Sequence, residues 1–167
     1  EVVKGPASAQ TGRGSTGGYI NLFSKQPQVL SFARGTAGVG APGYVRGTAD
    51  LNIGEQDLGL AGAAARLNLL YHDADTPGRD HVETKRIGFA PSVAVGLGGD
   101  TRAILSYVWL EQDNVPDYGI PFVPATNTVL GEYADEPAPV NYDNYYGVLD
   151  RDYEKLRSNI ATFAVEH

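Results

Sequence analysis

A glycine-rich stretch near the start of the chain has the spacing of a phosphate-binding loop. Gly12, Gly14 and Gly17 fit the pattern G-x-G-x-x-G, which in dinucleotide-binding proteins opens a helix whose amide groups face the pyrophosphate. Here Gly18 leads into Tyr19 and a β-like run rather than into a helix. We therefore favour a tight turn, in which these four glycines supply the backbone freedom, over a nucleotide site.

Acidic and histidine side chains gather farther along the chain and could bind a metal ion. The cluster consists of His72, Asp73, Asp75, Asp80 and His81. These residues straddle a predicted strand end and a loop with a Pro-Gly turn signal, and their spacing is not diagnostic of a metal site. A solvated loop tip is the favoured interpretation, and we predict neither a metal nor a cofactor.

Enzymatic chemistry finds no positive support in the sequence. Ser, His and Asp all occur, but no nucleophile-elbow motif places them together. The chain has no cysteine, which excludes a thiolate nucleophile, a disulfide scaffold and a Cys-ligated metal. We predict that the protein is not an enzyme.

The composition narrows the class of protein further. The chain has 167 residues, with 13 Lys plus Arg against 20 Asp plus Glu, a net charge of −7 and a pI near 4.8. Its scattered basic residues do not form the clustered cationic face that nucleic-acid binding needs. The densest apolar run, 58–70, falls short of the roughly 18 residues of a membrane-spanning helix, which leaves a membrane barrel open. The chain opens on Glu1, which favours truncation of a longer protein.

The elements that must position any site are predicted to be strands. Period-two alternation places one side-chain set on each face of a strand, and it recurs in six segments. The segments lie near 29–37, 44–53, 65–72, 86–97, 102–110 and 156–165. Several are about ten residues long, which suits tilted membrane-crossing strands better than ordinary soluble sheets. In one of them a small set, Gly88 to Gly96, alternates with a bulky set, as expected for a barrel whose outside faces lipid.

The connections between these strands alternate in length. The segments 54–62 and 98–100 are short turns, whereas 73–83 is a polar loop and about 112–152 forms a long loop with five prolines. Short turns at one end and long loops at the other are typical of an outer-membrane barrel with periplasmic turns and extracellular loops. A loop of this length would count against a compact soluble domain.

Specific motifs then indicate a family. Glu1-Val2-Val3-Lys4-Gly5-Pro6, followed by Gly12-Arg13-Gly14-Ser15-Thr16-Gly17-Gly18 and Ile20-Asn21-Leu22, resembles the closing section of the plug domain of TonB-dependent outer-membrane receptors. The later segments Ala65-Arg66-Leu67-Asn68, Asp75-Thr76-Pro77-Gly78-Arg79-Asp80 and Asp113-Asn114-Val115-Pro116-Asp117-Tyr118-Gly119-Ile120-Pro121 are similar to siderophore receptors of the ferric-catecholate branch. The resemblance covers essentially the whole chain.

The resemblance implies an all-β fold, a fragment of a plugged transmembrane β-barrel of roughly 22 strands. Residues 1–27 would be the C-terminal part of the plug, and residues 28–167 would be about six antiparallel barrel strands with a long extracellular loop at about 112–152. The implied function is TonB-energised import of a ferric siderophore across the Gram-negative outer membrane. Its partners would be the siderophore, the TonB complex through a segment absent from this chain, and outer-membrane lipid, with no nucleic acid.

Several side chains receive roles under this resemblance. Arg13 is expected to latch the plug to barrel carboxylates rather than to touch ligand. Aromatic rings at the barrel mouth could stack on the ligand while arginines meet its negative charge. The expected ligand-binding set is Tyr118, Phe122, Tyr145, Tyr146, Arg79 and Arg86. A membrane aromatic belt is expected from Tyr71, Tyr107 and Trp109.

One alternative comes from a different functional class. A small, complete outer-membrane barrel that serves as an adhesin or a structural protein would also fit this length, since about eight strands suffice. Such a barrel would have no use for the Lys-Gly-Pro and Gly-Arg-Gly-Ser segments that precede the first predicted barrel strand. Those segments favour the transporter.

Overall fold

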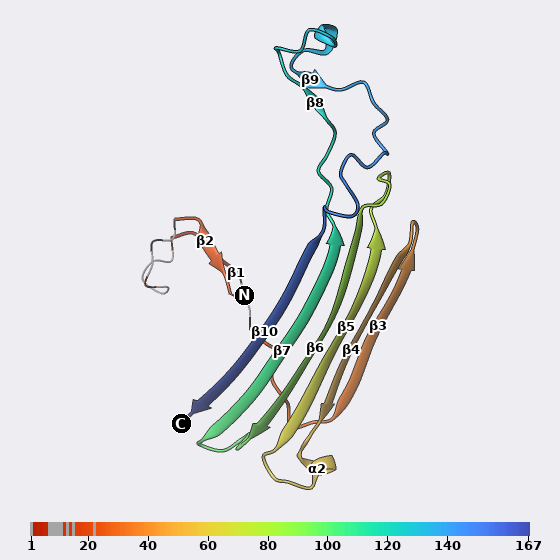
Figure 1. Cartoon of the computed structure of the whole chain (residues 1–167). Coiled ribbons are helices and arrows are strands. Elements are labelled where there is room, and N and C mark those ends of the chain that lie inside the picture. The colour runs from red at the N-terminus through yellow and green to blue at the C-terminus, as the bar shows by residue number, and fades with distance from the viewer. Residues whose placement is uncertain (1, 7–11, 13, 15, 22) are drawn as a thin grey trace.

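The chain forms one long, curved antiparallel sheet with a small hairpin before it and a large loop above it (Figure 1). This computed structural model describes residues 2–6, 12, 14, 16–21 and 23–167. Arg13, the predicted latch, lies outside the described residues and stays a prediction.

Six strands make up the main sheet, in the spatial order β10-β7-β6-β5-β4-β3, so that every strand pairs with its antiparallel neighbours in chain order. The strands are β3 (Phe32–Gly40), β4 (Tyr44–Ile53), β5 (Ala64–Asp75), β6 (Glu83–Val95), β7 (Arg102–Val115) and β10 (Glu154–Glu166). The prediction of six long antiparallel strands is confirmed. Strands of 9 to 14 residues match the length that a tilted strand needs to cross a bilayer.

The first strand begins later than the alternation predicts. The prediction started it near Val29, whereas β3 starts at Phe32. The carbonyl groups of Gln28 and Leu30 accept hydrogen bonds from the side chain of Asn52 on β4 instead of from a neighbouring strand. A tertiary contact therefore replaces the strand ladder at this point.

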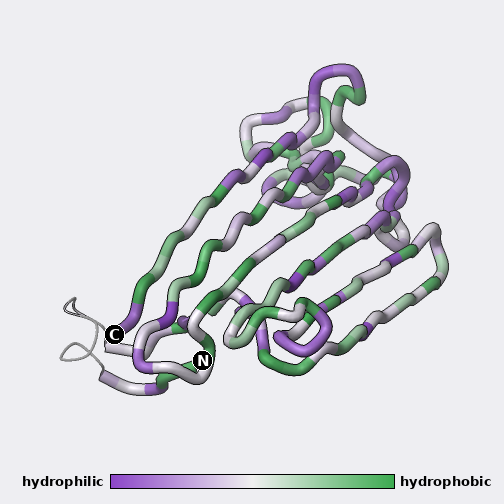
Figure 2. Tube along the Cα trace, turned by 90° about the horizontal axis from the view of Figure 1, so that it is seen from below, coloured by the Kyte–Doolittle hydropathy of each residue, from purple (hydrophilic) through white to green (hydrophobic). Residues whose placement is uncertain are grey.

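The register separates the side chains into two faces. Paired residues in every ladder have numbers of the same parity, so the odd-numbered residues of all six strands share one face and the even-numbered residues share the other. The odd-numbered face carries Leu67, Leu69, Phe89, Val93 and Leu105, while the even-numbered face carries smaller or polar side chains such as Arg66, Asn68 and Ser92. In Figure 2 hydrophobic and hydrophilic residues alternate along the strands accordingly.

The connections differ between the two ends of the sheet. One end, called the loop end here, carries the tight turn 41–43, the loop 76–82 and the long segment 116–153. That long segment contains a two-residue ladder between β8 (Phe122–Val123) and β9 (Glu136–Pro137) and the 3-10 turn η1 (Gly131–Tyr133). The opposite end carries 96–101 and the segment 54–63, in which α2 (Glu55–Leu58) makes a single helical turn.

The N-terminal hairpin pairs β1 (Val2–Lys4) with β2 (Gly18–Ile20). Gly18 adopts a φ of 112°, a conformation that L residues rarely take, and a Cβ at this position would clash with the carbonyl oxygen of Val3. Gly12 also has a positive φ, of 66°, while a Cβ on Gly14 or Gly17 would meet no described atom within 4 Å. The ladder thus requires glycine at position 18 in particular.

The sheet has almost no core of its own. Its buried hydrophobic residues are mostly small, namely Ala63, Ala64, Val82, Ala94, Ile104, Val123 and Ala138. Large apolar side chains of the odd-numbered face are open instead, for example Phe163 at 68% exposed and Ile87 at 50%. No helix in the described part of the chain is long and apolar enough to cross a membrane. An apolar face of this size is stable only when something apolar covers it.

Candidate functional site

The two faces of the sheet have different surroundings. Arg66 and Asn52, both on the even-numbered face, hydrogen-bond to the backbone of residues 26–30, so the chain's own preceding segment lies against that face. We call the even-numbered face the inner face and the odd-numbered face the outer face. The candidate sites are described in relation to these two faces and the loop end.

A basic row crosses the inner face close to the loop end. Arg46 on β4 pairs in register with His72 on β5, and His72 pairs with Arg86 on β6. Directly opposed residues in an antiparallel sheet have Cβ atoms about 4.5–5.5 Å apart, so three basic side chain types are held side by side. We call Arg46, His72 and Arg86 the basic row.

The arginines of the basic row lack compensation within the described part of the chain. Neither Arg46 nor Arg86 forms an ion pair there, although most other arginines of the sheet do. Arg46 and Arg86 lie on either side of His72, on β4 and β6, so the two guanidinium groups are not directly opposed to each other. Two guanidinium groups without an ion pair among the described residues leave the row able to accept an anionic group.

The histidine of the row is held by packing. The ring of Tyr44 meets the ring of His72 edge to face, with 5.6 Å between the centroids. The Nδ1 atom of His72 is buried and has no hydrogen-bond partner among the described residues. A buried polar atom normally has a partner, so this nitrogen is an unused hydrogen-bonding position in the row.

Arg79, one of the predicted ligand-binding residues, makes several contacts within the loops. Its guanidinium donates to the Asp117 carboxylate at 2.7 Å, to the carbonyl oxygen of Gly119 at 3.2 Å and to the carbonyl oxygen of Tyr142. These contacts tie the loop 76–82 to two parts of the long segment, and we call them the loop tie. The guanidinium also holds the pKa of the Asp117 carboxyl below its usual range, with help from the backbone N–H of Gly119. Arg79 therefore connects the loops, and its contact with a ligand stays a prediction.

The predicted aromatic ligands fall into two groups. Tyr118 and Phe122 are exposed, at 64% and 60%. Tyr145 and Tyr146 are half-buried in the loop, where the Tyr146 hydroxyl donates to the carbonyl oxygen of Asn141 at 2.6 Å. Burial and the nearby Asp152 carboxylate raise the pKa of Tyr145. Arg86 lies on the sheet wall, in the basic row, so the structure does not gather the six predicted residues into one cluster.

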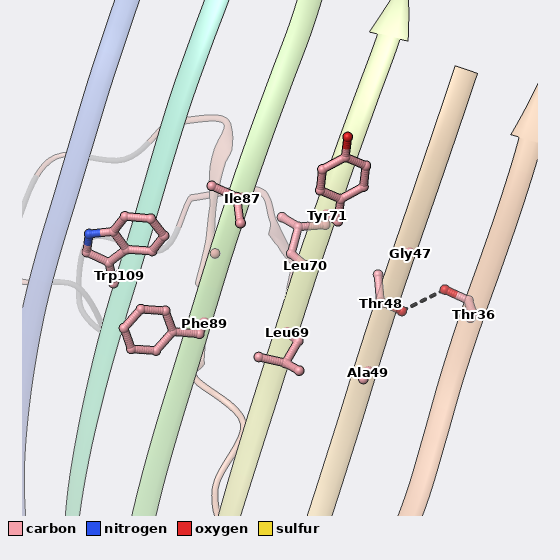
Figure 3. Close-up of a pocket in the computed structure, with 11 residues that line it drawn as sticks. Thr36, Gly47, Thr48, Ala49, Leu69, Leu70, Tyr71, Ile87, Phe89 and Trp109 are labelled. Carbon is pink, nitrogen blue, oxygen red and sulfur yellow. Dashed lines mark hydrogen bonds between the residues drawn. The ribbon is translucent and has the colours of Figure 1, made fainter. Parts of the chain in front are cut away.

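The outer face carries the residues predicted as an aromatic belt, of which Figure 3 labels Tyr71 and Trp109. Trp109 stacks on Phe89 with 5.2 Å between the ring centroids, and Tyr107 lies 6.1 Å from Phe89. Tyr71 and Trp109 also line a shallow apolar groove of about 460 Å³ whose floor includes Gly47 and Ala49. All three predicted belt residues are odd-numbered and share the apolar face. Their anchoring role stays a prediction.

Metal binding and dinucleotide binding, the two other chemistries considered from the sequence, have little geometric support among the described residues. His72 and Asp73 point to opposite faces of β5, and no group of three or more potential ligands is arranged to hold a metal within the described residues. After the glycine-rich motif the chain enters β2, a strand, where a dinucleotide site would need the start of a helix. The favoured interpretations, a loop tip and a turn, fit this geometry.

Sequence reasoning missed two members of the basic row as partners of Arg86. Arg46 receives no role from the sequence pattern, and His72 is considered there only as a potential metal ligand. The signal that could have found them is the pairing register, because Arg46 and His72 become neighbours only when the turn between β4 and β5 is counted as 54–63.

Known proteins match the chain over its full length, although no protein-family model matches it. It is 42% identical to the probable TonB-dependent siderophore receptor PiuA of Acinetobacter baumannii and 37% identical to the catecholate siderophore receptor Fiu of Escherichia coli K12. Each match covers 100% of this chain and 22% of the relative. The chain thus spans about a fifth of the length of these relatives.

Solved structures give the same result. The crystal structure of PiuA superimposes with a TM-score of 0.81 at 41% identity, covering 99% of this chain and 23% of that one. The open form of the ferric-catecholate import receptor Fiu from E. coli gives a TM-score of 0.79 at 36% identity, covering 97% of this chain and 24% of that one.

A curved sheet with an apolar outer face and an inner face occupied by the preceding segment defines part of an outer-membrane β-barrel receptor. The chain belongs to the family of TonB-dependent siderophore receptors. This membership places it in the outer membrane of a Gram-negative bacterium.

Proposed function

We propose that the intact receptor imports a ferric siderophore of the catecholate type, using energy delivered through TonB, and that it breaks no bonds in its ligand. Residues 1–27 supply the end of the plug, and residues 28–167 supply six strands of the barrel wall with the long loop above them. The proposal is supported by identity of 37–42% along the whole chain to siderophore receptors, including a catecholate receptor. This relationship disfavours the adhesin or structural barrel.

The observation that carries the ligand class is the basic row. Arg46, His72 and Arg86 face the interior close to the loop end, where a ligand enters a barrel of this type, and the two guanidinium groups have no ion pair in the described part of the chain. A ferric catecholate complex is an anion, and guanidinium groups form strong, charge-assisted hydrogen bonds to such oxygens. The exposed Tyr118 and Phe122 would add stacking surface above the row.

The test is ligand binding by the intact receptor with Arg46→Gln and Arg86→Gln, singly and together. A hydrogen bond to a charged group contributes about 1.5–3 kcal/mol, so each substitution should weaken binding of an anionic ferric catecholate roughly 10- to 100-fold. The matched control is Arg157→Gln, which removes an outer-face arginine paired with Glu111 at 2.9 Å. The control should bind normally; unchanged affinity in the double variant would refute the role of the row.

A further inference from the structure

A short segment between the N-terminal hairpin and β3 is fixed to the inner face of the sheet. Residues 25–31 run across β4 and β5, and Pro27 in their middle is buried. The contacts come from three side chains of the sheet, Asp50, Asn52 and Arg66, which we call the linker anchor. None of these residues belongs to the basic row, which lies farther towards the loop end.

Arg66 and Asp50 form the first half of the linker anchor. The guanidinium donates from Nε to Asp50 Oδ1 at 2.8 Å and from Nη2 to Asp50 Oδ2 at 2.7 Å, a bidentate pair. Its remaining nitrogen, Nη1, donates to the carbonyl oxygen of Gln26 at 2.6 Å. The Arg66 side chain is only 7% exposed and the Asp50 side chain 13%. Lys25 of the segment adds a second cation on Asp50, at 2.8 Å.

Asn52 forms the second half. Its amide Nδ2 donates to the carbonyl oxygens of Gln28 at 2.7 Å and Leu30 at 2.8 Å, while its Oδ1 accepts from the backbone N–H of Gln28 at 3.0 Å. Asn52 is 3% exposed, so these bonds are shielded from water. An asparagine amide offers two donors and an acceptor, and here it pairs with backbone groups that would otherwise be in a strand ladder.

The C-terminal end of the segment, at Val29 to Ser31, is also in close contact with the sheet. A Cβ on Gly54 would clash with the carbonyl oxygen of Val29, so the backbone directly after β4 approaches the segment closely there. The N–H of Gly54 also donates to the Ser31 hydroxyl at 2.8 Å, and that hydroxyl donates to Asp57. Contacts thus extend continuously from Lys25 to Ser31, and β3 follows at Phe32.

We propose that Asp50, Asn52 and Arg66 are positioning residues that keep residues 25–31 attached to the barrel wall while the plug before them is displaced during transport. This inference rests on the proposed function, because it needs a plug that is pulled from its N-terminal side. The three side chains hold the segment through five hydrogen bonds and ion pairs, four of which come from the buried Asn52 and Arg66. The Arg66–Asp50 pair fixes two of the three side chains to each other. The movable part of the plug ends just before Lys25.

The test is single-molecule force spectroscopy on the intact receptor in a lipid bilayer, pulled from its N-terminus without siderophore. In the wild type the chain released before the barrel resists should end near residue 24. In Asn52→Ala with Arg66→Ala, residues 25–31 should be released as well, which adds seven residues at about 3.6 Å each, or roughly 25 Å of contour length. Arg157→Ala, on the outer face, is the matched control and should give the wild-type length.

A second variant keeps the test decisive if the double variant does not assemble. Asn52→Ala alone leaves the contacts of Lys25 and Gln26 in place, so residues 28–31 should follow at lower force than in the wild type once those contacts have opened. Equal released lengths in all variants, or a wild type that releases to Phe32, would overturn the proposal. Because the force measurement needs neither ligand nor TonB, its failure is distinguishable from loss of siderophore uptake by the wild type, which would refute the proposed function instead.

Discussion

Asn52→Ala gives the sharpest prediction about how the sheet holds the segment that precedes it. The substitution removes three hydrogen bonds, two to carbonyl oxygens and one from a backbone N–H, all at a residue that is 3% exposed. A typical intramolecular hydrogen bond contributes about 0.5–1.5 kcal/mol net, so the loss totals about 3 kcal/mol for local opening of residues 25–31. Since about 1.4 kcal/mol is a factor of ten, opening should become roughly 100-fold more frequent.

The assay is hydrogen–deuterium exchange of the intact receptor, read by mass spectrometry on peptides that cover residues 23–31. Asn68→Ala is the matched control, because Asn68 is the same residue type on the inner face of the adjacent strand and makes no side-chain hydrogen bond to the segment in the described part of the chain. Exchange in β6 and β7 should stay unchanged in both variants. An Asn52→Ala variant that exchanges as slowly as the Asn68→Ala control would refute the reasoning.

Three further predictions concern other parts of the chain. Gly18→Ala should destabilise the N-terminal hairpin by about 1–3 kcal/mol and raise its sensitivity to protease, while Gly14→Ala should not, since Gly18, unlike Gly14, has a positive φ and a close backbone neighbour. The pKa of Asp117 is lowered in the folded state, so the loop tie is intact above the ordinary value of 3.8 and is lost as pH falls below that value through the lowered pKa. Hydrogen–deuterium exchange labelling of the loop 76–82 should therefore increase only below about pH 4. An increase already at pH 6 would contradict this. Phe89→Lys on the outer face should lower the free energy of unfolding in lipid vesicles by about 2–4 kcal/mol, and Val108→Lys on the inner face should lower it clearly less.

Local alternation is sufficient to predict the strands of this chain. In the segment 86–97, for example, small even-numbered residues alternate with bulky odd-numbered ones, and β6 has this arrangement. Membrane strands make the pattern regular because one face meets lipid and the other meets the interior. The number of strands, their antiparallel order and the long loop after β7 could all be predicted for this reason.

Features that depend on distant partners could not be predicted in this way. The start of β3 shifted from Val29 to Phe32 because Asn52, more than twenty residues away, takes over the backbone partners. Arg79 was expected to meet a ligand, and its carboxylate and carbonyl partners come from segments 38 or more residues away. The four-residue helix α2 is too short for a periodic pattern to indicate.

The candidate site likewise combines residues that a local pattern indicates with residues that only distant strand pairing brings together. Arg86 was selected from the sequence as a cation near the mouth, and the pattern placed it on the polar face of its strand. Its neighbours Arg46 and His72 depend on register across two strand pairings, which a single strand pattern does not specify. Tyr118, Phe122 and the half-buried Tyr145 lie in a loop without periodicity, so their exposure had no local signal.

The central claim is that this chain is part of a receptor that imports an anionic ferric siderophore. The most direct measurement is uptake of radioactive iron, supplied as a ferric catecholate, by cells that express the intact receptor and lack other siderophore receptors. We expect uptake that requires TonB and that falls at least tenfold in the Arg46→Gln and Arg86→Gln double variant at subsaturating ligand. Uptake that is absent in the wild type, or that is independent of TonB, would contradict it.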